Sequence, residues 1–216
     1  MATSQKHGID FEKWVKETFF QSYIQTSHIH KWDALDVVFK EGFKDFTKDF
    51  VGLPVSIKYY KNGGLIGFSD VLRQFENRED FLLIIGFWEQ RGNFKKCVVV
   101  EAVKVTANEW QKFFSPLTKK QLDSLLDIVK SEELNTEQKR TEAQKFKRTL
   151  PKTQITLNPK IQDDQHRVQC SLKSKVFWEI LAKKDKYKNE ECSLWGTNPN
   201  KILSSSRIFN SKPKLD

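Results

Sequence analysis

The eight-residue run at positions 81–88, Phe-Leu-Leu-Ile-Ile-Gly-Phe-Trp, constrains the fold more than any other segment of the chain. It is almost continuously apolar, which is typical of a central β-strand that is buried on both faces. Such a strand requires other elements to pack on each side of its sheet. Val98, Val99 and Val100 follow a turn at 91–93, and they predict an antiparallel partner strand over residues 96–105.

Helical and extended patterns surround this predicted hairpin. Apolar residues at helical spacing predict an opening helix over 8–24, and Ser69 can cap a short helix at 70–77. The later segments predict helices at 108–114, 118–131 and 175–181, an exposed helix or a linker at 132–148, and short strands at 153–158 and 167–172. This order predicts an α/β fold, in which a central mixed β-sheet is flanked by helices and a basic C-terminal β-ribbon and helices follow.

The chain has 216 residues, a length that suggests one domain, and its charge is unevenly distributed. Residues 1–100 contain 14 Lys and Arg against 13 Asp and Glu, whereas residues 101–216 contain 23 against 15. A basic second half favours a polyanionic partner, and nucleic acid is the first candidate. The alternative is that these basic residues are lysines solvated on surface helices.

The cysteines and the hydropathy pattern indicate where the protein works. Cys97, Cys170 and Cys192 are widely spaced and odd in number, so they form neither a disulfide framework nor a zinc pattern. The first residues lack the apolar segment of a signal peptide, and no apolar run is long enough to span a membrane. We therefore expect a cytoplasmic protein without a membrane partner.

A lysine stands in the middle of a predicted strand at 53–61, which runs into the turn sequence Asn-Gly-Gly at 62–64. The apolar residues at 55, 57 and 59 alternate with Ser56, Lys58 and Tyr60, so one face of the strand is apolar and the other is polar. A lysine in such a place could be an edge-strand charge that discourages aggregation. The alternative is a catalytic lysine, if a carboxylate lies beside it.

Asp36 is the preferred carboxylate because it directly precedes the apolar run at 37–39, although Asp33 could be the true ligand. If these two strands pair, an acid and Lys58 converge on one face of a sheet. A carboxylate at the end of a strand suits Mg²⁺, which takes oxygen ligands and keeps several waters. A nearby lysine can orient or deprotonate a water, or offset the charge of a phosphate. The pattern therefore indicates hydrolysis of phosphodiester bonds.

Together these residues resemble the PD-(D/E)XK nuclease superfamily, and within it the type II restriction endonucleases. The resemblance covers residues 8–105 and rests on four features in order, namely the opening helix with Phe11-Glu12, the acid in the strand at 35–38, the triplet Ser56-Ile57-Lys58, and the helix that follows. It implies a single nuclease domain over 1–216, with a catalytic core at 1–105 and a DNA-recognition portion at 106–216.

The resemblance also implies a Mg²⁺ cofactor and an active site. Asp36 and the main-chain carbonyl of Ile57 would bind the metal, and Lys58 would position the attacking water. Glu12 matches an acid that many relatives carry on the first helix, although it could instead be a surface residue that pairs with Lys16.

The triplet departs from the family because Ser56 stands where an Asp or Glu is usual. Some members of the superfamily carry Ser-X-Lys and take the missing acid from the following helix. Asp70 or Glu76 could supply it here, and the spacing favours neither. Each also has a structural explanation, because Asp70 suits a helix N-terminus and Glu76 suits a solvated helix end.

The C-terminal strands carry side chains that are suited to DNA. In each strand one face is apolar, and the polar face supplies the predicted DNA-binding residues Asn158, Lys160, Arg167, Gln169, Ser171 and Lys173. Arginine pairs with guanine and the amides pair with adenine, while lysines suit phosphates. The alternative is an ordinary amphipathic hairpin whose polar face is in water.

The expected function is Mg²⁺-dependent cleavage of double-stranded DNA at a specific short sequence. Restriction enzymes of this kind usually act as homodimers on palindromic sites, so the resemblance implies a homodimer. Two alternatives stay open. One is a non-catalytic, sequence-specific DNA-binding protein that keeps the nuclease fold, and the other is a structure-specific repair nuclease or an RNA-processing nuclease.

Overall fold

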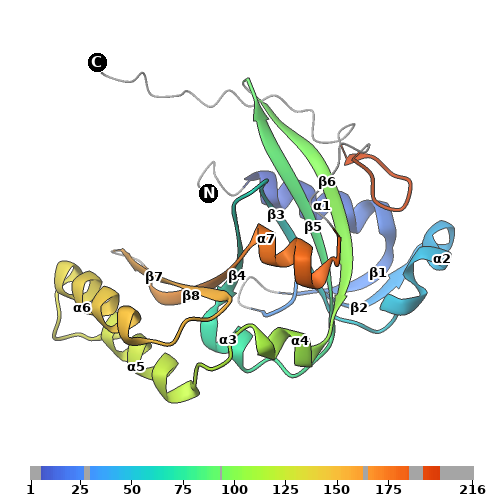
Figure 1. Ribbon diagram of the computed structural model, residues 1–216. Helices are drawn as coiled ribbons and strands as arrows, with labels where there is room; N and C mark the ends of the chain where they lie inside the picture. Colours follow the sequence, from blue (N-terminus) through green and yellow to red (C-terminus); the bar gives the residue numbers. More distant parts are fainter. Residues whose placement is uncertain (1–5, 27–29, 93, 163–164, 185–191, 200–216) are drawn as a thin grey trace.

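The computed structural model describes residues 6–26, 30–92, 94–162, 165–184 and 192–199 (Figure 1). Sheet A has five strands in the order β1-β2-β3-β5-β6, namely β1 (Phe20–Gln25), β2 (Ala34–Phe39), β3 (Val55–Lys61), β5 (Phe81–Arg91) and β6 (Phe94–Val105). Sheet B has three strands in the order β4-β8-β7, namely β4 (Leu65–Asp70), β7 (Ile155–Gln162) and β8 (Gln165–Lys173).

Helices connect and cover the two sheets. The α-helices are α1 (Lys6–Phe19), α2 (Lys44–Thr47), α3 (Val71–Phe75), α4 (Ala107–Lys112), α5 (Lys119–Lys130), α6 (Thr136–Thr149) and α7 (Ser174–Val176). Two 3₁₀ turns lie at Glu41–Phe43 and Lys48–Phe50, and α7 continues as a π-helical turn at Phe177–Leu181. No helix among the described residues is long and apolar enough to cross a membrane.

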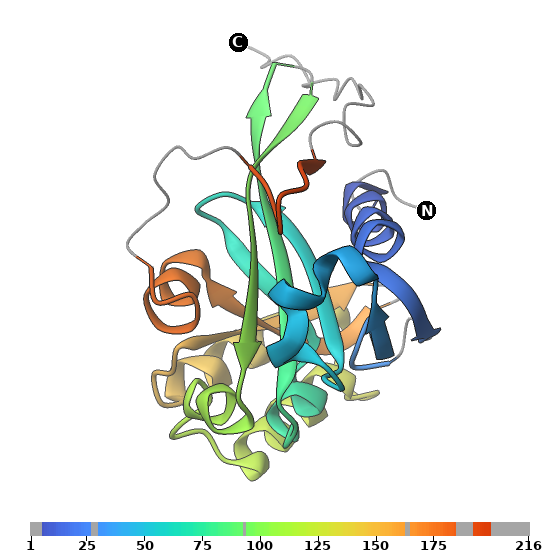
Figure 2. The same cartoon turned by 90° about the vertical axis from the view of Figure 1, so that its right-hand side faces the viewer.

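Sheet A is mixed, which confirms the predicted α/β class. Strands β3 and β5 run parallel, whereas the neighbouring pairs β1–β2, β2–β3 and β5–β6 are antiparallel. The predicted hairpin at 81–105 is confirmed as β5–β6, and Figure 2 shows that its tip projects beyond the rest of the sheet. Residues 81–87 of β5 are all buried, as expected for a strand that is covered on both faces.

The two faces of sheet A pack against different helices, and both views show α1 on one side of the sheet and α7 on the other (Figures 1 and 2). Phe11, Trp14 and Val15 of α1 belong to a core cluster with Val55 and Ile57 of β3. The residues on the opposite face of sheet A lie in a second core cluster, which also contains the apolar face of sheet B. This cluster includes Leu83, Ile85, Phe87, Trp110, Phe177 and Leu157.

One predicted helix is too long, and the segment that was expected to be either an exposed helix or a linker is a helix. The opening helix ends at Phe19, and residues 20–25 form strand β1, so the predicted helix over 8–24 is too long. The charged segment at 132–148 is a helix, because α6 begins at a complete capping box formed by Asn135 and Gln138.

Sheet B contains the predicted C-terminal ribbon as β7 and β8, whereas the sequence patterns did not predict its third strand, β4. Strand β4 pairs with β8, which lies about a hundred positions later in the chain, and the β7–β8 hairpin is longer than expected. Helices α5 and α6 cover its apolar face, and the ribbon extends away from sheet A (Figure 1). The division into a catalytic core at 1–105 and a DNA-recognition portion at 106–216 stays a prediction. Sheet B combines β4 from the first portion with β7 and β8 from the second.

Gly86 allows helix α1 to lie close to sheet A. A Cβ atom at this position would lie 2.6 Å from Cδ2 of Tyr59 and 2.7 Å from Cε2 of Phe11. The two rings stack with centroids 4.7 Å apart, so neither can move without disturbing the other.

The change Gly86→Ala is therefore expected to lower the free energy of unfolding by about 1–3 kcal/mol. Urea denaturation measures this change. The matched control is Gly42→Ala, because nothing lies within 4 Å of a Cβ atom there. Equal stability of the Gly86→Ala protein and the wild type would contradict this packing.

Candidate active site

The candidate site lies where two strands of sheet A separate. Strand β2 pairs with β3 through Ala34 and Val55, and the N–H of Asp33 donates to the carbonyl of Val55 at 2.8 Å. Two residues further along β3, the main-chain N–H of Ile57 donates to Oδ2 of Asp33 at 2.6 Å. A carboxylate therefore takes the place that a neighbouring strand would otherwise occupy.

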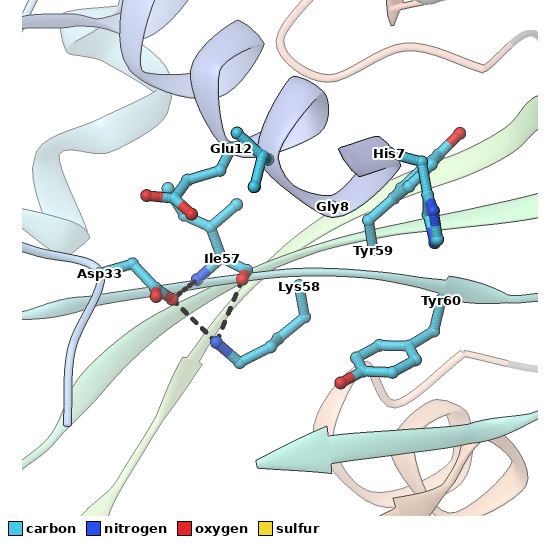
Figure 3. A pocket seen from close by; sticks show the side chains of 9 residues that line it. His7, Gly8, Glu12, Asp33, Ile57, Lys58, Tyr59 and Tyr60 are labelled. Carbon is cyan, nitrogen blue, oxygen red and sulfur yellow. Dashed lines mark hydrogen bonds and ion pairs between the residues drawn. The ribbon is translucent and has the colours of Figure 1, made fainter. Parts of the chain in front are cut away.

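Lys58 completes this arrangement. Its Nζ lies 2.8 Å from Oδ2 of Asp33 and 3.1 Å from the carbonyl oxygen of Ile57 (Figure 3). The side chain of Lys58 is 19% exposed and that of Asp33 is 26% exposed, so the pair is partly buried but accessible to solvent. The predicted meeting of an acid and Lys58 at the edge of β3 thus has a structural counterpart, with Asp33 as the acid.

These groups open into a cavity of about 420 Å³. It is lined by His7, Gly8, Ile9, Glu12, Asp33, Ile57, Lys58, Tyr59 and Tyr60. Glu12 projects from α1, and Figure 3 shows its carboxylate on the Asp33 side of the cavity. Packing of α1 on β3 therefore brings a second carboxylate to the site.

The environment of Lys58 favours its charged form. Burial alone lowers the pKa of this amine, but the charge and hydrogen bond of Asp33, with smaller contributions from Tyr60 and Glu12, raise the pKa above its ordinary value of 10.5. Lys58 is consequently an ammonium group at neutral pH. It can donate hydrogen bonds and stabilise negative charge, and it is not a base at that pH.

His7 also lines the cavity, and the sequence analysis did not select it. Burial, and to a smaller extent the positive charge of Lys95, lower its pKa to about 4, although Asp10 opposes the shift. At neutral pH the imidazole is therefore uncharged. The sequence signal that could have indicated His7 is helical spacing, because His7 precedes Phe11 by four positions. In the structure both rings contact Tyr59.

The structure does not place Asp36 in the site, so the preference for Asp36 over Asp33 is corrected. Asp36 is an exposed residue in β2 with a φ of +47°, next to a register shift in the pairing with β1. Aspartate tolerates this left-handed conformation better than most residues. Asp36 is not among the residues that line the cavity, and Asp33 is the acid that lies beside Lys58.

Ser56 and the two acids considered as its replacement lie in different surroundings. Ser56 is buried, and its Oγ lies 3.5 Å from Oδ2 of Asp33, which is at the limit of a hydrogen bond. Asp70 caps α3 by accepting from the N–H of Arg73, and Glu76 forms an exposed ion pair with Lys119.

Asp70 and Glu76 therefore have the structural roles that the sequence analysis left open, and neither lines the cavity. Of Glu12, Asp70 and Glu76, Glu12 is the one that lines the cavity.

The donor set suits a hard divalent cation. Glu12 and Asp33 supply carboxylate oxygens, and Ile57 supplies a carbonyl oxygen beside them. Mg²⁺ binds through one or two carboxylates plus waters and substrate phosphates, so this set fits Mg²⁺ in number and kind. Within the described ranges no group of three or more His, Cys, Asp or Glu side chains is placed to bind a metal.

The predicted DNA-binding residues share the outer face of sheet B, here called the polar face. Cross-strand register pairs Asn158 with Gln169 and Lys160 with Arg167, and it places Lys173 opposite Leu65. Lys160, Arg167 and Lys173 are exposed, whereas Asn158 and Gln169 are half-buried. The predicted contact residues are therefore brought together on one face, and all but one are at least partly exposed.

Ser171 is the exception, because it is only 3% exposed. Its Oγ accepts a hydrogen bond from Nδ2 of Asn158 at 2.8 Å, so it orients this amide and does not face a partner itself. Tyr60 connects the polar face to the cavity. It lines the cavity and donates its hydroxyl to the carbonyl of Gly67, whose partner across the strands is Ser171.

No protein-family model matches the sequence, and neither a curated protein nor a solved structure matches the chain. The features that bear on function are therefore the Asp33–Lys58 pair, the cavity beside it and the polar face of sheet B.

Proposed function

We propose that this chain is a Mg²⁺-dependent nuclease that hydrolyses phosphodiester bonds in double-stranded DNA. The observation that carries the proposal is the Asp33–Lys58 pair at 2.8 Å, next to the carbonyl of Ile57 and open to a cavity that Glu12 also lines. Two carboxylates, a carbonyl and a protonated lysine are the groups that such hydrolysis uses.

The residues divide the chemistry between them. Lys58 donates hydrogen bonds through Nζ, either to the attacking water or to a phosphate oxygen on which negative charge develops. Asp33 holds this ammonium in place, and its own position is fixed by the N–H of Ile57.

Glu12, Asp33 and the carbonyl of Ile57 would hold Mg²⁺, which supplies Lewis-acid chemistry at the phosphate when it is bound.

Duplex DNA is the proposed substrate because of the polar face. It places exposed Lys160, Arg167 and Lys173 together with the amides of Asn158 and Gln169, and Tyr60 connects it to the cavity. Lysines bind phosphates, whereas arginine and amide side chains distinguish bases in the major groove.

These features support cleavage at a specific short site, as in a type II restriction endonuclease. We further propose that it acts as a homodimer, since two sites are needed to cut both strands of a palindrome.

The polar face yields a prediction for binding. The double change Lys160→Gln and Lys173→Gln is expected to weaken binding to all duplexes by a similar factor. The slope of log affinity against log salt should become shallower by about 0.9 for each lysine–phosphate interaction that the double change removes. Fluorescence anisotropy across a salt series measures both quantities. Lys44→Gln, an exposed change on α2, serves as the control, and an unchanged salt slope in the double variant would exclude these phosphate interactions.

The proposed activity is tested with unmethylated phage DNA. Incubation with Mg²⁺ is expected to produce discrete, reproducible fragments on a gel, and EDTA should abolish them. RNA and branched DNA serve as comparison substrates, because preferential cleavage of either would favour a processing or repair nuclease. Intact phage DNA at every Mg²⁺ concentration would contradict the proposal.

One observation favours a second candidate function. Ser56 occupies the position of the usual acid, and a serine hydroxyl is a weaker metal ligand than a carboxylate. A protein of this kind could bind a specific DNA sequence without cutting it. The Lys58 variant described in the Discussion separates the two possibilities.

A further inference from the structure

Helix α1 contains a buried charge next to the site. The side chain of Lys16 is only 5% exposed, although lysine is rarely buried without a partner. Its Nζ lies 2.6 Å from Oε1 of Glu12, four residues earlier on the same helix. An ordinary pair at this spacing is solvated and contributes little to stability, so burial of this pair requires a separate explanation.

Strand β1 supplies two further contacts of Lys16. Its Nζ donates to Oε1 of Gln25 at 3.2 Å and lies 5.2 Å from the centre of the Tyr23 ring. The ammonium group is therefore held between helix α1 and strand β1, and these contacts restrict its side chain to few rotamers. Glu12, which is 31% exposed, is in turn fixed on the side of the cavity where Asp33 lies (Figure 3).

The same helix offers a direct comparison. Lys13 and Glu17 also stand four positions apart, but their charged atoms are 3.6 Å apart and their side chains are 69% and 66% exposed. That pair has the features of a solvated surface pair. The Glu12–Lys16 pair differs in burial, in its shorter contact and in its second anchor on β1.

We propose that Lys16 is a positioning residue, which, together with Gln25, holds the carboxylate of Glu12 in the orientation that binds the divalent cation. This inference rests on the proposed function, because it assigns a purpose to Glu12 in that site. Partners that orient a metal-binding carboxylate commonly change metal affinity by about 10–100-fold when they are removed. Lys16 would thus act through Glu12, without touching the substrate.

Calorimetric titration with Mn²⁺ in the absence of DNA tests the inference. The change Lys16→Met keeps an apolar side chain of similar length, and it is expected to weaken Mn²⁺ binding about tenfold. The change also removes the electrostatic repulsion between the Lys16 ammonium group and Mn²⁺. This effect by itself would strengthen Mn²⁺ binding. The sign of the change is therefore decisive: weaker binding supports positioning, whereas unchanged or tighter binding overturns it.

Two further variants complete the test. Lys13→Met is the matched control and should bind Mn²⁺ as the wild type does. Gln25→Leu keeps the charge of Lys16 but removes its anchor, so it should weaken Mn²⁺ binding by a smaller factor. If Lys16→Met fails to fold in a thermal denaturation control, Gln25→Leu decides the question, and wild-type affinity in that variant overturns the inference.

The Mg²⁺ dependence of DNA cleavage gives a second measurement. Lys16→Met should raise the Mg²⁺ concentration for half-maximal rate, and saturating Mg²⁺ should restore most of the maximal rate. A purely structural role would lower the amount of active protein without moving that concentration. Failure of the wild type to bind Mn²⁺ or to cleave would overturn the proposed function, whereas wild-type behaviour of Lys16→Met would overturn the positioning role alone.

Discussion

Asp33→Asn is expected to lower the rate of DNA cleavage by about 10³-fold or more, because it removes the charge that pairs with Lys58 and that would bind the metal in the proposed site. Asparagine has nearly the same size, and its oxygen can still accept the N–H bond that Ile57 now gives to Asp33. The fold should therefore remain intact. Single-turnover cleavage of a duplex substrate, with circular dichroism as a check on folding, measures the effect.

Asp36→Asn is the matched control for this prediction. It changes the same side chain three positions further along, at an exposed site that does not line the cavity. Its cleavage rate should stay within a few-fold of the wild type. The opposite result, in which Asp36→Asn abolishes cleavage and Asp33→Asn does not, would show that the carboxylate in the site has been assigned incorrectly.

Lys58→Met is expected to reduce the cleavage rate by about 10²–10⁴-fold while specific DNA binding is retained. The methionine has no charge with which to orient water or stabilise the phosphate. Lys61→Met, an exposed change at the end of the same strand, should cleave normally. A wild type that binds a specific sequence but never cleaves it, with Lys58→Met unchanged in binding, would establish the non-catalytic alternative.

The protonation of Lys58 also gives a pH dependence with a defined sign. Its pKa in the folded protein is raised above 10.5, since the interactions with Asp33 outweigh the effect of burial. The stabilisation from this pair is therefore fully present below the pKa of an unfolded lysine, and it is lost as pH rises through the higher folded pKa. Loss of the ammonium should not limit the cleavage rate between pH 7 and about pH 10.

The elements with strong local patterns could be predicted from the sequence. The apolar run at 81–88 predicted a strand covered on both faces, and the valines that follow predicted its antiparallel partner. Strand β1 was missed because Tyr23 lies four positions after Phe19 and so extends the helical stripe by coincidence. Strand β4 was missed because Gly67 interrupts its short apolar pattern, and its pairing with distant β8 has no local signal.

The candidate site was predictable in its chemistry but not in every residue. Alternation along β3 placed Lys58 on the polar side of its strand, and an acid was expected from the preceding strand. The identity of that acid depends on where β2 begins and on a register shift beside Asp36, and neither can be deduced from hydropathy. The acids on and beside α3 were equally ambiguous, because capping by Asp70 and pairing of Glu76 with Lys119 are tertiary features.

Anomalous scattering from Mn²⁺, in crystals of the protein bound to duplex DNA, would locate the metal-binding residues. We expect a peak within coordination distance of the Asp33 carboxylate and the Ile57 carbonyl, in the cavity that Glu12 lines. Mn²⁺ bound instead at Asp36, Asp70 or Glu76, or no peak in this cavity at saturating Mn²⁺, would contradict it.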